Sequence, residues 1–210
     1  MSQSSTIDLT TRAVDLPETP TEDLHYEVIE GRVVELPPMS SRETYLASIL
    51  IALLGLHART SEQGRVVGEM LFKLDPSRNQ KRRPDVAFVS FDRWPRTRRV
   101  PATHGWEVVP ELAIEVVSPT DAAVDLLEKI EEYFQAGVRR VWVVYPGSRC
   151  VYDYETLTTI RVLRVGDRIE GGDLLPGFGL TLADLFEVDQ VDDDEGEGED
   201  VAESGPRTEA

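Results

Sequence analysis

Glu111–Ser118 (ELAIEVVS) is the segment that most restricts the fold, because its interior is almost continuously apolar. A strand with one solvated face alternates apolar and polar residues, whereas a strand covered on both faces does not. We therefore expect a central strand with a layer of structure on each side. Two helical patterns can supply these layers. Ser40–His57 begins with a capping box and continues with leucines at helical spacing, and Asp121–Ala136 has an apolar face of its own.

The rest of the chain is predicted to supply further strands. Tyr26–Leu36 reads as a hairpin that turns at Glu30-Gly31, and the polar stretch 75–82 (DPSRNQKR) reads as a turn. A mixed series of this kind indicates an α/β (α+β) domain, with a mixed central sheet flanked by helices, an N-terminal β-hairpin and additional C-terminal strands. The other expected strands and a short closing helix are Arg65–Leu74, Pro84–Phe91, Val138–Tyr145, Cys150–Tyr154, Thr159–Val165 and Leu180–Phe186.

The acidic residues are concentrated at the two ends of the chain. The formal net charge is -17, but 189–210 holds ten acids and one arginine, and 1–23 holds five acids and one arginine. Segments with so few apolar residues and so much like charge cannot repay the entropy of ordering. We expect one folded domain at 24–187, a disordered extension at 1–23 and a disordered acidic tail at 188–210. The net charge of the domain alone does not exclude nucleic acid as a partner.

Several classes of protein are disfavoured by the sequence. The longest apolar stretch, Leu46–Leu56, has eleven residues, whereas a membrane span needs about 20. The N-terminus lacks the basic and apolar regions of a secretory signal, and one cysteine, Cys150, fits a reducing compartment. The three histidines show no zinc-ligand spacing. A cytoplasmic protein without a membrane partner is expected.

Two carboxylates occupy strands where charge is unusual. Glu115 lies inside an apolar run, and a buried charge must be paired, protonated or bound to a metal. Asp85 precedes the run Val86–Val89, although aspartate is depleted in strands. Simpler roles are open for both: Glu115 on a solvated face or paired with arginine, and Asp85 as a turn residue. Together they suit a hard cation such as Mg²⁺ or Mn²⁺, which could activate water for phosphodiester hydrolysis.

Lys129 is the cation that we expect near these acids. On a helical projection it lies about 110° from the centre of the stripe formed by Val124, Leu127, Ile130 and Phe134, where a long side chain could reach the sheet. The simpler alternative is a surface pair with the residue one turn earlier, Asp125, which would contribute only a few tenths of a kcal/mol.

These residues resemble a known pattern. Pro84-Asp85, then Glu115, then a lysine is similar to the PD-(D/E)XK nuclease superfamily. The motifs YEVIEG, PDVAFV and PELAIEVVSP, with the helix that carries Lys129 and the VWVV strand after it, look more closely like the Uma-two family of restriction-endonuclease-like proteins. The resemblance covers about 26–186, and the order and spacing of the motifs make it fairly specific.

The resemblance implies a restriction-endonuclease-like fold, with Asp85 and Glu115 binding the divalent cation and Lys129 orienting or activating water. The superfamily's lysine usually stands two residues after the second acid, where this chain has Val117. Glu43 is an additional candidate, because many of these nucleases carry a carboxylate on this helix. Its place in the capping box explains it equally well.

Basic residues are frequent between Arg78 and Arg99, on both sides of Asp85 in the chain. We expect Arg82, Arg83, Arg96 and Arg98 from this interval to contact nucleic acid, although a charge run is usually a solvated loop. The basic residues of the interval are Arg78, Lys81, Arg82, Arg83, Arg93, Arg96, Arg98 and Arg99.

The function expected from the sequence is a metal-dependent endonuclease that hydrolyses phosphodiester bonds, with DNA as substrate and Mg²⁺ or Mn²⁺ as cofactor. The alternative is a non-catalytic binding or regulatory module that keeps the nuclease fold, and hydrolysis of a small phosphoester is a third reading. The oligomeric state stays open, with a homodimer among the alternatives.

Overall fold

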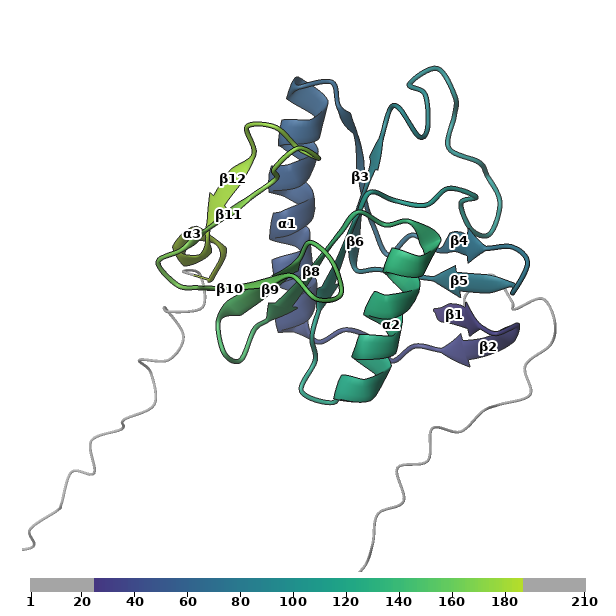
Figure 1. The fold of residues 1–210 in the computed structure, drawn as a ribbon, viewed down its shortest axis with the longest axis horizontal. Coiled ribbons are helices and arrows are strands. Elements are labelled where there is room, and N and C mark those ends of the chain that lie inside the picture. The colour runs from purple at the N-terminus through teal and green to yellow at the C-terminus, as the bar shows by residue number, and fades with distance from the viewer. Residues whose placement is uncertain (1–24, 187–210) are drawn as a thin grey trace, which may run out of the picture.

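The computed structural model describes residues 25–186, so the extensions expected at 1–23 and 188–210 lie outside the described residues. Three helices and twelve strands are found within the described part (Figure 1). In chain order they are β1 Tyr26–Ile29, β2 Arg32–Glu35, α1 Ser41–Thr60, β3 Gly64–Gly68, β4 Phe72–Asp75, β5 Gln80–Arg82, β6 Val86–Ser90, β7 Leu112–Val116, α2 Ala123–Ala136, β8 Arg140–Tyr145, β9 Cys150–Tyr154, β10 Ile160–Arg164, β11 Arg168–Glu170, β12 Gly179–Thr181 and α3 Leu182–Phe186.

A six-stranded sheet forms the centre of the molecule, with strand order β10-β9-β8-β7-β6-β3. β7 and β8 are parallel and the other neighbours are antiparallel, so the sheet is mixed. All five residues of β7 are buried, which confirms the prediction of a central strand covered on both faces. α1 and α2 lie on opposite sides of the sheet (Figure 1). The predicted fold class is therefore confirmed.

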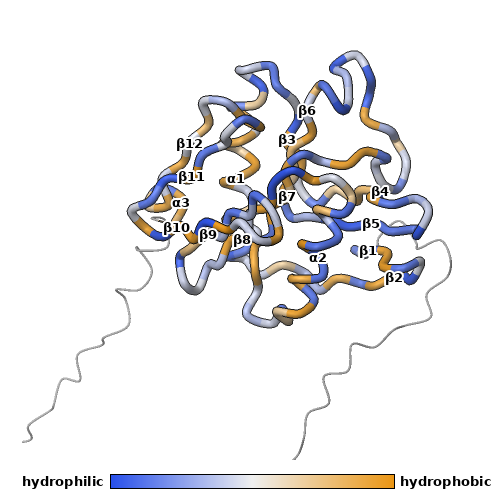
Figure 2. Tube along the Cα trace, viewed as in Figure 1, coloured by the Kyte–Doolittle hydropathy of each residue, from blue (hydrophilic) through white to orange (hydrophobic). Residues whose placement is uncertain are grey.

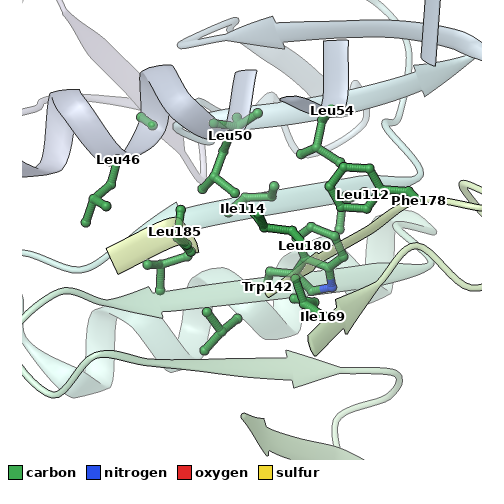
Figure 3. Packing of buried hydrophobic residues seen from close by; sticks show 14 of the residues in the cluster. Leu46, Leu50, Leu54, Leu112, Ile114, Trp142, Ile169, Phe178, Leu180 and Leu185 are labelled. Atoms are coloured by element: carbon green, nitrogen blue, oxygen red, sulfur yellow. The ribbon is translucent and has the colours of Figure 1, made fainter. Parts of the chain in front are cut away.

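α1 packs on one face of the sheet through a row of leucines. Ser40 caps the helix and Glu43 completes the capping box, as the sequence predicts. Leu46, Leu50 and Leu54 are almost completely buried, and Figure 3 shows them in a row facing the sheet. Burying each such side chain stabilises the fold by about 1.5–3 kcal/mol. On the sheet side the row meets alternate residues of β7 and β8, namely Leu112, Ile114, Val116, Trp142 and Val144.

The second sheet was not foreseen. It has the order β2-β1-β5-β4, and it contains the predicted hairpin as β1 and β2. The prediction of a single strand at Arg65–Leu74 is wrong. The strand ends at Gly68, because the next residue, Glu69, has a φ of 47° and turns the chain. β3 therefore joins the large sheet and β4 the small one. The stretch 75–82, expected to be only a turn, contains β5.

The end of the described chain closes the α1 side of the core. β11 and β12 form a small antiparallel hairpin, in which Ile169 lies opposite Leu180. Both residues join the core cluster beneath α1, and Figure 3 shows them near Trp142. The helix expected at Leu180–Phe186 is shorter, because its first two residues belong to β12.

Hydrophobic residues are spread over many short elements. Figure 2 shows hydrophobic and hydrophilic positions alternating along the trace rather than gathering in one long segment. Among the helices within residues 25–186, none has the length and apolar content that crossing a bilayer requires.

Candidate active site

Asp85 immediately precedes β6, and Glu115 lies in the neighbouring strand β7. β6 and β7 are antiparallel with Val86 opposite Ile114, so the same register continued by one residue sets Asp85 opposite Glu115. The Cβ atoms of opposite residues in such a pair are about 4.5–5.5 Å apart. The backbone N–H of Val116 also donates to Asp85 Oδ2 at 2.6 Å. The structure thus brings together the two carboxylates on which the sequence argument rests.

Glu115 points to the face of the sheet that α2 covers. Its side chain has two donors from that helix: Lys129 Nζ donates to Oε2 at 2.8 Å, and Tyr133 Oη donates to Oε1 at 2.6 Å. The residue is only 6% exposed. Because both oxygens accept a hydrogen bond, the buried charge is paired rather than stranded. A solvated face for Glu115, the simpler sequence alternative, is wrong.

Lys129 lies on the buried face of α2, which corrects the sequence interpretation. The apolar stripe expected for this helix included Val124 and Leu127, but these are 67% and 51% exposed. The buried residues are Tyr133, which lies four positions after Lys129 on the same side of the helix, and Ile130, a member of the expected stripe. The lysine side chain is 14% exposed and pairs across to the sheets, so it is not the exposed Asp125 partner considered from spacing.

Glu27, on β1, is the site residue that the sequence argument missed. Its Oε1 lies 3.1 Å from Lys129 Nζ, and its side chain is 2% exposed. Lys129 is therefore bridged between Glu115 on the large sheet and Glu27 on the small one. The available signal was weak: Glu27 falls within the YEVIEG motif of the family resemblance, but alternation in a four-residue strand could not show which of its faces is covered.

Arg82 is held inside the same polar network. Its guanidinium donates to Glu27 Oε2 at 2.7 Å and to Glu132 Oε2 at 2.5 Å, and its side chain is 6% exposed. Gln80 Nε2 also donates to Glu132 at 2.6 Å. Arg82 therefore fixes Glu27 from the side opposite Lys129. Its guanidinium is thus directed at these two carboxylates, and its expected contact with nucleic acid stays a prediction.

The surroundings shift the pKa values of the acidic groups in different directions. Burial raises the pKa of Asp85 to about 7, with a further upward contribution from Glu115 and an opposing one from Lys129. Burial also raises the pKa of Glu115, against the opposing effect of Lys129. For Glu27 burial acts upward, but Lys129 and Arg82 outweigh it and the pKa is lowered.

Lys129 is a permanent cation at neutral pH. Burial acts to lower its pKa, but the carboxylates of Glu115, Glu27 and Asp85 outweigh this effect and raise the pKa above its ordinary value. The site accordingly contains the fixed positive charge of Lys129, an ionised Glu27, and two carboxyl groups, Asp85 and Glu115, whose pKa values are raised.

The other predicted site residues lie apart from this network. Glu43 Oε2 accepts from the backbone N–H of Ser40 at 2.7 Å, so its carboxylate completes the cap of α1. Arg96 and Arg98 follow the far end of β6, eleven and thirteen residues after Asp85 in the chain. Arg96 pairs with Glu62, and the Arg98 guanidinium lies 3.6 Å from the ring centroid of Trp94.

Arg83 is the one expected nucleic-acid contact that lies beside the carboxylates. Its backbone N–H donates to Glu27 Oε1 at 2.7 Å, and its guanidinium donates to the carbonyl oxygen of Glu69 at 2.6 Å. Glu69 N–H in turn donates to the Asp85 carbonyl at 3.1 Å. The side chain is half-buried and stands where β5 leads towards Asp85.

The oxygen donors of Asp85 and Glu115 fit a hard divalent cation. Mg²⁺ is usually bound by one or two carboxylates and keeps several waters. Within residues 25–186 no group of three or more histidine, cysteine, aspartate and glutamate side chains is arranged to hold a metal ion, so a cation here would depend on these two carboxylates and on water. Burial and then the neighbouring Glu115 raise the pKa of Asp85, and a bound cation would favour its ionised form.

Comparison with known proteins identifies the family and the fold. The model of the Uma2 family, described as "Putative restriction endonuclease", matches residues 13–183. The fold is similar to that in the crystal structure of "a putative nuclease belonging to DUF820" from Anabaena variabilis, with a TM-score of 0.71, 18% identity, and coverage of 81% of this chain and 94% of that chain. No match was found among curated proteins. The chain belongs to the Uma2 family and has a nuclease-like fold.

Proposed function

We propose that this member of the Uma2 family is an endonuclease that uses Mg²⁺ or Mn²⁺ to hydrolyse phosphodiester bonds, with DNA as its substrate. The observation that carries the proposal is the pair of opposed carboxylates, Asp85 and Glu115, beside the buried ammonium of Lys129. The family description and the nuclease-like fold support the reaction class.

Asp85 and Glu115 would hold the cation. When bound, a divalent ion lowers the pKa of a coordinated water and neutralises charge on a phosphoryl oxygen. In the hydrolysis itself, the oxygen of water bonds to phosphorus and the water releases a proton to solvent, while the bond from phosphorus to one ester oxygen breaks and that oxygen takes up a proton from solvent.

Lys129 serves this reaction as a positive charge. Because its pKa is raised, it is fully protonated at neutral pH and cannot accept the proton of the attacking water. An ammonium can instead donate to a non-bridging phosphate oxygen, where negative charge develops in the transition state. Glu27 and Glu115 fix the position of this ammonium from two sheets. Orientation and charge stabilisation are therefore the proposed roles, and proton abstraction is not.

Cleavage assays with the full-length protein test the proposal. Supercoiled plasmid and linear duplex DNA would be incubated with Mg²⁺ or Mn²⁺, and with EDTA as the metal-free control. Glu115→Gln removes the charge of a proposed ligand, and Glu128→Gln makes the same charge change at an exposed position on α2. We expect metal-dependent cutting by the wild type and by Glu128→Gln only. Equal cutting by Glu115→Gln would show the assignment to be wrong.

A non-catalytic module with a nuclease fold is the second candidate. It is favoured by Val117, which stands where the superfamily usually has its lysine, and by the complete hydrogen bonding of Glu115 to Lys129 and Tyr133. Calorimetric titration with Mg²⁺ and Mn²⁺ separates the two candidates. Binding that disappears in Asp85→Ala supports the enzyme, whereas no binding by the wild type supports the module.

A further inference from the structure

The outer face of the four-stranded sheet carries an unusual pair of lysines. Lys73 on β4 lies directly opposite Lys81 on β5, and Lys81 lies opposite Val28 on β1. Side chains in one such row point to the same face of a sheet. The partners of the opposite face, Phe72 and Arg82, point towards the core and the polar network. The two lysines are thus on the face turned away from α2.

This pairing is unfavourable by itself. Like charges directly opposite each other on neighbouring strands repel, because their Cβ atoms are only about 4.5–5.5 Å apart. Within residues 25–186 neither ammonium has a hydrogen bond or ion pair with another side chain. The chain has only three lysines, Lys73, Lys81 and Lys129. Two of the three therefore stand side by side without a counter-charge.

The surroundings hold these lysines in place. The stem of Lys73 passes Gly105: a Cβ built at this glycine, whose φ is +97°, would lie 3.6 Å from Lys73 Cγ. The backbone N–H of Lys73 donates to the carbonyl of Trp106 at 2.9 Å. Both lysines are half-buried, so the sheet restricts their stems while the ammonium groups remain available to an anion.

The row continues to the candidate active site through Arg83. Arg83 is two residues beyond Lys81 and therefore on the same face, and its guanidinium carbon lies 5.8 Å from the ring centroid of Tyr26. Asp85 follows Arg83 by two residues, where the chain leaves β5 and enters β6. Figure 1 shows the four strands of this sheet side by side, next to α2.

From this arrangement we infer that Lys73, Lys81 and Arg83 form a phosphate-binding row that seats the backbone of a nucleic acid strand and leads it to Asp85 and Glu115. The inference rests on the proposed nuclease function, because it assigns the substrate path to that site. It replaces the loop of Arg96 and Arg98, which lies at the other end of β6. Lysine ammonium groups act here as point charges for phosphate, which carries no base sequence information.

Binding without cleavage tests the row. A short fluorescein-labelled DNA duplex would be titrated with full-length protein in EDTA, by fluorescence anisotropy at several salt concentrations. The test variant is Lys73→Gln/Lys81→Gln. The control is Arg99→Gln/Arg164→Gln, which removes the same charge from two exposed arginines elsewhere. The slope of log K against log salt should fall by about 1.8 in the test variant and stay unchanged in the control.

The melting temperature and the acetylation of lysines provide two further checks on the binding experiment. Removing a repulsive pair should leave the melting temperature of the test variant equal to or above that of the wild type, so weak binding cannot be assigned to unfolding. In the wild type, DNA should slow acetylation of Lys73 and Lys81, detected by mass spectrometry, with buried Lys129 as the internal reference. Unchanged acetylation would contradict the inference.

The outcomes separate this inference from the proposed function. If the wild type cuts no DNA with metal but binds it through Lys73 and Lys81, the row stands and the nuclease proposal fails. If the wild type cuts DNA and the test variant binds and cuts equally well, the row is wrong and the nuclease proposal stands. A wild type that binds no DNA at low salt, or a control that loses as much affinity, overturns the row.

Discussion

Asp85→Asn is expected to stabilise the protein above neutral pH while it abolishes cleavage. Burial, together with the neighbouring Glu115, raises the pKa of Asp85 from 3.8 to about 7. An acid whose pKa is raised in the folded state contributes stability that is lost as pH rises from the unfolded value through the folded one. At about 1.36 kcal/mol for each pH unit, the wild type loses about 4 kcal/mol by pH 8.

Asparagine has the same shape and no charge to bury, so this loss should be absent from the variant. Its Oδ1 can still accept the hydrogen bond that the N–H of Val116 donates to Asp85. The difference in the free energy of unfolding between variant and wild type should therefore grow by about 3 kcal/mol from about pH 5 to about pH 8.

Urea unfolding, followed by tryptophan fluorescence in EDTA, measures this difference. The chain has three tryptophans, and EDTA removes any stabilisation by a bound cation. Asp92→Asn is the matched control, because Asp92 is exposed and its replacement should leave the pH dependence unchanged. A difference between Asp85→Asn and wild type that is constant across this pH range would refute the reasoning.

Three further predictions concern the same site. Lys129→Met leaves Glu115 and Glu27 buried without their shared cation, so it should cost about 3–5 kcal/mol of unfolding free energy at neutral pH and less at lower pH, where the carboxyls protonate; urea titrations at both pH values check this. Tyr133→Phe removes one donor to Glu115 and should cost about 1–3 kcal/mol, measured in the same way. The affinity for Mg²⁺ should rise with pH up to about 7, because Asp85 must lose its proton to bind the ion; calorimetry in buffers of different ionisation heat should detect the released proton, and an affinity that is flat across pH would contradict the assignment.

Local patterns in the sequence were enough to predict most elements. The capping box of Ser40 and Glu43 marks the start of α1, because both groups lie within one helical turn. Gly137 ends α2 in the left-handed conformation, with φ 98°, which glycine adopts without a steric penalty. The apolar run of β7 likewise predicts burial on both faces, since this pattern lies within five consecutive residues.

The sequence also singled out Asp85 and Glu115 as acids that need a partner, because burying a charge costs free energy. A carboxylate in an apolar strand is costly unless something compensates it, so its presence points to a partner. The identity of that partner was beyond the sequence. Tyr133 and Lys129 are the compensating donors for Glu115, and they come from a helix whose covered face was predicted only in part: Ile130 is buried as expected, whereas Val124 and Leu127 are exposed.

The tertiary structure decided which face of α2 is buried. Periodicity shows which residues share a side of a helix, but it does not show which side meets the sheet. The apolar residues Val124 and Leu127 are exposed, whereas Lys129 is buried because carboxylates on two sheets compensate its charge.

The sequence by itself thus determined the helices, most of the strands and the two strand-borne acids, because each depends on residues close together in the chain. The tertiary structure alone decided that β3 and β4 enter different sheets and that Glu27 and Arg82 join the site. Glu27 and Arg82 are far from Glu115 in the chain; they pair with each other inside the small sheet, and only the packing of that sheet beside α2 brings Glu27 within hydrogen-bonding distance of Lys129.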